Sequence, residues 1–105
     1  MLQKGYDFLG LAQRAGQVQS GDASAEAVIK KGKAKLVILA VDASERTKQH
    51  FINFSQYKNV RWIVGGEKLQ LGIALGKSPR SVVVIMESNF AEKLHQLFVG
   101  EEEDF

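Results

Sequence analysis

A cluster of four lysines lies in the first third of the chain, at Lys30, Lys31, Lys33 and Lys35. The first two end a predicted helix, and the last two alternate along the turn that follows it. Such a cluster is typical of a solvated surface or of a site that neutralises phosphates, where each contact releases counterions. Backbone N–H groups at the start of the same helix, at 21–23, are predicted to be free for an anion. Together these features favour a polyanionic partner.

The segment Gly76-Lys77-Ser78 is similar to the end of a phosphate-binding P-loop. A P-loop has four residues between its first glycine and Gly-Lys-Ser/Thr, and it lies between a strand and a helix. Here the preceding glycine, Gly72, leaves only three residues between, and the segment follows a predicted helix. We therefore expect no nucleotide-binding loop at this position.

Residues suited to catalysis or metal binding are sparse. His50 and His95 are the only histidines, neither has a partner at metal-ligand spacing on its own predicted helix, and there is no cysteine. Asp42 follows a buried strand, where α/β folds often place ligands, but capping of the next helix is the favoured interpretation. We expect no catalytic residue, metal or cofactor, and hence a protein that is not an enzyme.

Apolar periodicity and glycine stops predict helices and strands that alternate along the whole chain. Helices are expected at 3–15, between a cap at 20–22 and a stop at 32, from a cap at 44 through 57, at 68–75 and at 89–98. Strands are expected at 17–20, 36–40, 60–64 and 82–86. The continuous apolar run at 36–40 indicates a strand covered on both faces. The pattern predicts an α/β fold, a three-layer α/β/α sandwich around a mixed four-stranded sheet.

The same periodicity predicts which helix faces are buried. In the second helix Ala25, Val28 and Ile29 share one face, whereas Ala23 and Ala27 lie on the opposite side. Leu11 in the first helix and Tyr57 in the third are predicted to join the apolar faces of their helices.

Size and charge agree with one soluble domain. The chain has 105 residues, with 45% hydrophobic and 25% charged residues, which fits a single domain spanning 1–105. Residues 1–60 carry nine Lys and Arg against five Asp and Glu, and residues 61–105 carry five against seven. The acidic tail at 101–105 accounts for the second imbalance and is expected to be a solvated end. No apolar run is long enough to span a membrane, and a cytoplasmic location is expected.

Several segments of the sequence also resemble those of a known protein family. Gly21 to Lys35, followed by Leu-Val-Ile-Leu-Ala-Val-Asp-Ala, resembles the kink-turn-binding ribosomal protein family named for archaeal L-seven-Ae, and Lys68-Leu-Gln-Leu-Gly-Ile-Ala-Leu-Gly76 resembles its later segment. Leu9-Gly-Leu-Ala-Gln-Arg-Ala-Gly16 and Asn89-Phe-Ala-Glu-Lys-Leu are similar to the bacterial YlxQ-type branch. The resemblance covers about residues 8–98. It implies the same sandwich and a partner that is structured RNA, ribosomal or riboswitch-like, with the ribosome itself among the implied partners.

The resemblance implies two RNA contacts. One is the start of the second helix, where the family uses Asn, Glu and, three residues further on, Lys to read sheared G·A pairs. The other is the loop before the last strand, which covers an extruded base. The three reader positions fall on Ala23, Ser24 and Ala27, so the polar readers are missing, while Lys31 keeps the basic residue one turn later. Because base contacts specify and phosphate contacts only position, we expect weaker or less selective binding than is typical of the family.

The expected RNA-binding residues lie on these two elements and on the basic cluster: Gly21, Asp22, Ala23, Ser24, Ala27, Lys30, Lys31, Lys33, Lys68, Lys77, Ser78 and Arg80. Two other functions stay open. One is a protein-interaction module that keeps the fold and presents the alanine face to a protein. The other is a small enzyme acting near Asp42, which is disfavoured because no nucleophile, base and orienting group gather in the sequence.

Overall fold

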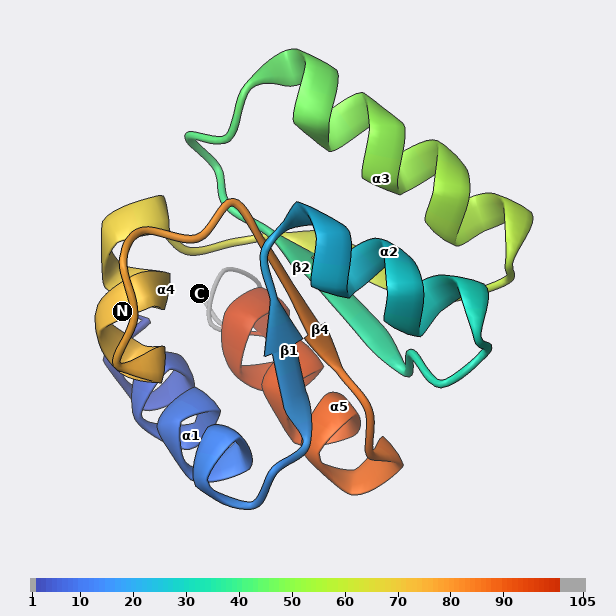
Figure 1. Ribbon diagram of the computed structural model, residues 1–105. Coiled ribbons are helices and arrows are strands. Elements are labelled where there is room, and N and C mark those ends of the chain that lie inside the picture. The colour runs from blue at the N-terminus through green and yellow to red at the C-terminus, as the bar shows by residue number, and fades with distance from the viewer. Residues whose placement is uncertain (1, 101–105) are drawn as a thin grey trace.

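A computed structural model describes residues 2–100 of the chain (Figure 1). Its elements, in chain order, are α1 (Gln3–Arg14), β1 (Val18–Ser20), α2 (Asp22–Lys30), β2 (Leu36–Leu39), α3 (Glu45–Tyr57), β3 (Trp62–Val64), α4 (Lys68–Leu75), β4 (Val82–Ile85), α5 (Ser88–His95) and the π-helical turn η1 (Gln96–Gly100). All nine expected helices and strands are therefore present. The acidic tail predicted at 101–105 lies outside the described residues.

The four strands form one mixed sheet in the order β1-β4-β2-β3. β4 pairs antiparallel with both β1 and β2, and β2 pairs parallel with β3. The two central strands are fully buried along their lengths, as the continuous apolar runs predict. The mixed four-stranded sheet expected from the sequence is confirmed.

Helices cover both faces of the sheet, which gives the three-layer sandwich (Figure 1). On one face α1, α4 and α5 pack over alternate strand residues that include Leu36, Ile38 and Val83. On the other face α2 and α3 pack over the remaining strand residues, including Val37 and Leu39. No helix in residues 2–100 is long and apolar enough to cross a membrane.

Two predicted inward positions are wrong. Leu11 is 48% exposed and Tyr57 is 82% exposed. Leu11 lies two residues after the fully buried Leu9, a rotation of roughly 200° around the helix axis, so the two cannot share a face. Tyr57 lies six residues after the buried Phe51, which places it roughly 120° away from the face that meets the sheet.

Candidate nucleic-acid interface

The start of α2 is open to solvent. Gly21 caps the helix with φ 93°, a left-handed conformation that favours glycine, and no side chain within residues 2–100 caps the helix start. Asp22 and Ala23, the first two residues of the helix, are exposed. One prediction is wrong here, because the N–H of Gly21 is not free: it donates to the carbonyl of Val82 at 3.1 Å. That bond fastens the start of α2 to the first residue of β4.

The outward side of α2 is a ridge of small side chains. Ala25, Val28 and Ile29 are buried against the sheet, as predicted. Ala23, Ser24 and Ala27 are exposed on the outer side. Small side chains let a partner approach the helix backbone closely, and a hollow lies on each side of this ridge.

The first hollow, here called the basic hollow, lies beside the edge strand β1 and measures about 310 Å³. It is lined by Gln19, Ser24, Ala27, Val28, Lys31, Lys33 and Met86. Both of its lysines are exposed, and no carboxylate is among its lining residues. The hollow can therefore receive a negatively charged group without repulsion from its own walls.

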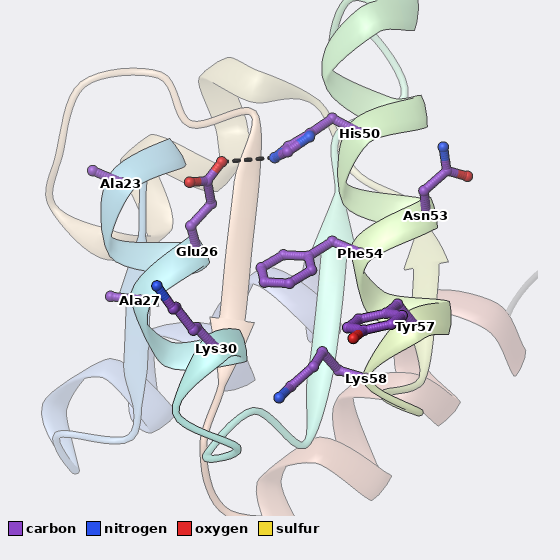
Figure 2. Close-up of a pocket in the computed structure, with 9 residues that line it drawn as sticks. All are labelled: Ala23, Glu26, Ala27, Lys30, His50, Asn53, Phe54, Tyr57 and Lys58. Carbon is purple, nitrogen blue, oxygen red and sulfur yellow. Dashed lines mark hydrogen bonds and ion pairs between the residues drawn. The ribbon is translucent and has the colours of Figure 1, made fainter.

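The second hollow is the α2–α3 groove, which measures about 840 Å³ and runs between the two helices on that face of the sheet (Figure 2). Its walls are formed by Ala23, Glu26, Ala27, Lys30, His50, Asn53, Phe54, Tyr57 and Lys58. Lys30 belongs to this groove and not to the basic hollow, and Lys35 lines neither. The single lysine cluster expected from the sequence is thus divided between the two sides of α2.

A polar side-chain contact between α2 and α3 lies at one end of the groove. His50 Nε2 lies 2.6 Å from Glu26 Oε2, and both side chains are about half exposed. His50 is therefore a surface residue, and its carboxylate partner comes from a neighbouring helix. Figure 2 shows this pair at the opposite end of the groove from Lys30 and Lys58.

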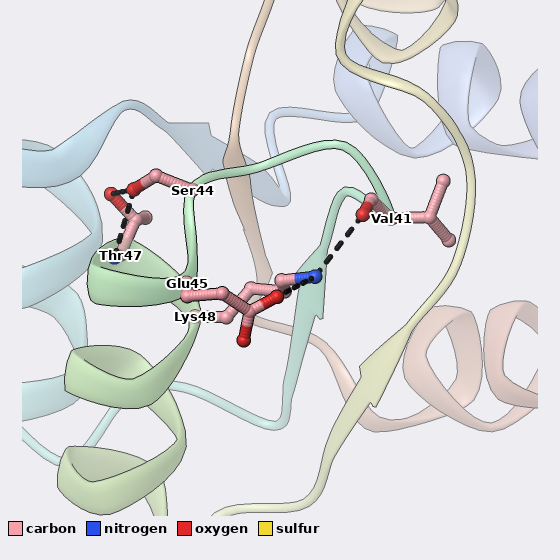
Figure 3. Close-up of polar contacts among 5 residues, drawn as sticks. All are labelled: Val41, Ser44, Glu45, Thr47 and Lys48. Carbon is pink, nitrogen blue, oxygen red and sulfur yellow. Dashed lines mark hydrogen bonds and ion pairs between the residues drawn. The ribbon is translucent and has the colours of Figure 1, made fainter.

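The position of α3 is fixed at its first turn (Figure 3). The Ser44 hydroxyl accepts a hydrogen bond from the Thr47 N–H at 3.1 Å, the cap that the sequence predicts. Lys48 Nζ pairs with Glu45 at 3.1 Å and donates to the carbonyl of Val41, also at 3.1 Å. The bond from Lys48 to Val41 ties the first turn of α3 to the segment just after β2, and α3 forms one wall of the groove.

The loop at 76–81 passes beside the start of α2 (Figure 1). Gly76 ends α4 in a left-handed conformation, and the Lys77 N–H donates to the carbonyl of Gly72 at 2.8 Å. A Cβ atom on Gly72 would lie 2.3 Å from the carbonyl oxygen of Ser78. Only glycine at position 72 therefore lets the loop pack this closely against α4. The segment leads from a helix into a strand, which agrees with the expectation that it is not a P-loop.

Arg80 carries an unsatisfied donor in this loop. Its Nε is buried and has no hydrogen-bond partner within residues 2–100, and its Nη1 lies 3.4 Å from the Ser78 hydroxyl, at the long limit for a hydrogen bond. Lys77 and Ser78 are exposed. Buried polar groups are nearly always paired, so this unpaired nitrogen is an exception within residues 2–100.

Lys68 is the first residue of α4, next to this loop. Its carbonyl accepts the Arg80 N–H at 3.0 Å, and its own N–H donates to Asp42 Oδ1 at 2.9 Å. The expectation that Asp42 caps the next helix is therefore wrong, because Ser44 caps α3 and Asp42 bonds the start of α4. The hydroxyl of Tyr6 accepts the neighbouring N–H of Glu67 at 3.0 Å.

The expected residues thus fall in two regions along one side of the molecule. The start of α2 and the loop with Lys77, Ser78 and Arg80 form the first, with Lys68 beside them. Lys30, Lys31 and Lys33 form the second, at the other end of a nine-residue helix about 14 Å long. Sequence patterns missed Gly72, Phe54 and Lys58, since their roles depend on which segments pack together. Within residues 2–100 no group of acidic residues and histidines could hold a metal ion.

Comparison with known proteins gives consistent matches. The family model described as "Ribosomal protein L7Ae/L30e/S12e/Gadd45 family" matches residues 3–95. A protein of Enterococcus faecium named "RNA-binding protein YlxQ" is 37% identical over 98 residues, which cover 93% of this chain and 94% of that protein. A Bacillus subtilis protein of the same name is 36% identical over 92 residues, which cover 88% of this chain and 92% of that protein.

Solved structures share the fold. A protein of unknown function from Bacillus halodurans superposes with a TM-score of 0.85 at 33% identity, covering 90% of this chain and 95% of its own. The Giardia lamblia 15.5kD RNA binding protein superposes with a TM-score of 0.76 at 25% identity, covering 98% of this chain and 88% of its own.

Proposed function

Because the chain belongs to the ribosomal protein L7Ae/L30e/S12e/Gadd45 family, we propose that it binds structured RNA of the kink-turn type. Relatives named as RNA-binding proteins match nearly its whole length, and a structural neighbour is also named for RNA binding. The family and these names agree with the expectation that the protein is not an enzyme.

One observation carries the proposal: the exposed side of α2 is a smooth ridge with cations on both flanks. Ala23 and Ala27 place no bulk on the ridge, while Lys31 and Lys33 line the hollow on one side and Lys30 lines the other. A nucleic-acid backbone can therefore lie across the helix with its phosphates near ammonium groups. Each neutralised phosphate releases counterions, which drives binding and makes it dependent on salt.

The loop at 76–81 supplies the second contact. The Gly21–Val82 hydrogen bond holds this loop beside the start of α2, and Gly72 lets it pack closely on α4. The Arg80 side chain is partly exposed, so its guanidinium can donate to a phosphate oxygen of the bound RNA. Lys77, Ser78 and Lys68 are the further donors that we assign to this end of the site.

Base-specific contacts are few in this proposal. The reader positions of the family hold Ala23, Ser24 and Ala27, whose side chains offer a single hydroxyl for base edges. We therefore expect backbone contacts to supply most of the affinity and shape to supply the preference for kinked RNA. Ribosomal and riboswitch-like RNAs present such shapes, and a cytoplasmic location belongs to the same proposal.

The test is a titration of a kink-turn RNA and of a plain duplex of equal length, at low and high salt. We expect the wild-type protein to bind the kink turn more tightly than the duplex. The double variant Lys30→Glu with Lys31→Glu should bind the kink turn at least about tenfold more weakly than the wild type. The matched control, Lys4→Glu with Lys93→Glu, makes the same change in charge on exposed positions of α1 and α5. Equal losses in the two double variants would mean that the α2 side is not the RNA site.

A protein-interaction module is the second candidate, favoured by the alanines at the reader positions. In that case the ridge of Ala23 and Ala27 would meet a protein and not RNA. Failure of the wild-type protein to bind either RNA, together with a protein partner whose capture survives nuclease treatment, would favour this function over the first.

A further inference from the structure

The α2–α3 groove combines aromatic and cationic side chains on a solvent-exposed surface. Phe54 points from α3 toward α2, and Tyr57 stands beside it at the end of α3 (Figure 2). Tyr57 is 82% exposed, the highest exposure among the large apolar side chains of residues 2–100. Neither the fold nor the RNA contacts described above use this ring.

Cations flank these rings. Lys30, the last residue of α2, and Lys58, the residue just after α3, line the same end of the groove (Figure 2). Proteins that hold unpaired nucleotides use this combination, with bases stacked on aromatic rings and the backbone tracked by positive charge. The groove volume of about 840 Å³ lies within the range of roughly 300–1,000 Å³ that small-molecule sites occupy, which leaves room for a nucleotide.

The charge distribution gives the groove a direction. Its one carboxylate, on Glu26, is engaged by His50 at the opposite end from the lysines. A phosphate would therefore lie at the Lys30 and Lys58 end, away from the carboxylate, and its base would reach toward Phe54 and Tyr57.

The groove is continuous with the proposed RNA face. Ala23 and Ala27 line it, and Ala27 also lines the basic hollow on the other side of α2. A strand that crosses the ridge of α2 therefore passes directly from one hollow to the other. A single-stranded segment at the edge of a structured RNA is the part whose bases are free to enter.

We infer that the α2–α3 groove binds an unpaired nucleotide of the RNA that lies across α2, with its base stacked on Tyr57 and its phosphate between Lys30 and Lys58. This inference rests on the proposed function, and it adds a single-stranded element to the RNA partner. Specificity for the identity of the base is not expected, since every base offers a face for stacking.

The experiment compares a kink-turn RNA with blunt ends to the same RNA carrying a short single-stranded extension. We expect the wild-type protein to bind the extended RNA roughly 5- to 150-fold more tightly, the range that base–aromatic stacking gives. Tyr57→Ala should remove that gain and leave binding of the blunt RNA unchanged, while Tyr57→Phe should keep it. Lys58→Gln should reduce this gain in affinity. Leu11→Ala, at an exposed apolar position on α1, is the matched control and should keep the gain.

Photocrosslinking locates the nucleotide. A 4-thiouridine in the extension should crosslink within residues 53–58. Three results would overturn the inference while leaving the proposed function intact. They are equal affinity of the wild-type protein for the two RNAs, an equal loss of affinity for both RNAs in Tyr57→Ala, and crosslinks confined to segments outside 53–58. Absence of binding to either RNA would overturn both. Because Tyr57 is exposed, its variants should keep the wild-type melting temperature, so a change in affinity will report on the groove and not on unfolding.

Discussion

Asp42, just after β2, accepts a 2.9 Å hydrogen bond from the backbone N–H of Lys68, the first residue of α4. The two residues lie 26 positions apart, and the side chain of Glu67, the cap residue itself, does not bond the helix end. The carbonyl of Lys68 in turn accepts the N–H of Arg80. One carboxylate therefore connects the end of a central strand, the start of α4 and the loop that we assign to RNA.

Removal of this carboxylate should weaken the whole connection. We expect Asp42→Ala to lower the free energy of unfolding by about 1 kcal/mol, the usual cost of a lost helix cap. Asp42→Asn keeps an oxygen that accepts a hydrogen bond from the same N–H, so it should lower the free energy of unfolding by only a few tenths of a kcal/mol. Urea unfolding of the three proteins measures the difference. An equal loss of stability in the two variants would show that the negative charge of Asp42, and not its hydrogen bond, stabilises the start of α4.

Gly72 offers a test of the loop itself. An added Cβ would lie 2.3 Å from the Ser78 oxygen and 2.9 Å from the Lys77 oxygen, and both are backbone atoms that cannot rotate away. Gly72→Ala should therefore destabilise the fold by about 1–3 kcal/mol, as overpacking generally does. It should also lower RNA affinity, since the loop must move. Thermal unfolding and RNA titration measure the two effects.

The control for this substitution is Ile73→Ala on the same helix, at an exposed position. It should change stability by no more than about 0.5 kcal/mol, as surface substitutions usually do. If Gly72→Ala melts at the wild-type temperature, the close contact between α4 and the loop does not constrain the protein.

Much of the fold could be predicted from the sequence because its local signals agree. The apolar runs at 36–40 and 82–86 become the central strands, and Ser44 and Gly76 mark helix ends as their chemistry requires. The orientation of exposed side chains could not be predicted in the same way. Lys30 and Lys31 are adjacent in sequence but line different hollows, because their surroundings depend on the neighbouring helix and strand. Asp42 likewise has an obvious partner only once the sheet brings α4 beside it.

The division of the lysine cluster predicts unequal roles for neighbouring lysines. Lys33 lines the basic hollow, whereas Lys35, two residues further on, lines neither hollow. Lys33→Gln should therefore reduce the slope of log affinity against log salt by about 1, and Lys35→Gln should leave it near the wild-type value. Titrations of one kink-turn RNA across a salt series measure both slopes. Equal slopes in the two variants would indicate a diffuse cationic surface instead of a defined contact.

The alanine ridge predicts a gain of function. The exposed positions 23, 24 and 27 are those at which the family resemblance places base-reading Asn, Glu and Lys. The triple variant Ala23→Asn, Ser24→Glu, Ala27→Lys should therefore gain base-edge contacts. Each such contact adds about 1–3 kcal/mol of discrimination on the scale known for DNA bases. We expect selectivity for a kink turn over a duplex to rise at least about tenfold, measured as the ratio of the two dissociation constants.

The control for this gain exchanges two of the new side chains. Ala23→Asn, Ser24→Lys, Ala27→Glu has the same composition and the same net charge, but puts the charged groups at the wrong positions. Because all three sites are exposed, both variants should fold with stabilities close to the wild type. A rise in selectivity that appears only in the correctly ordered variant would place RNA base edges over α2. An equal rise in both, or none in either, would mean that the RNA does not meet this helix in the way we propose.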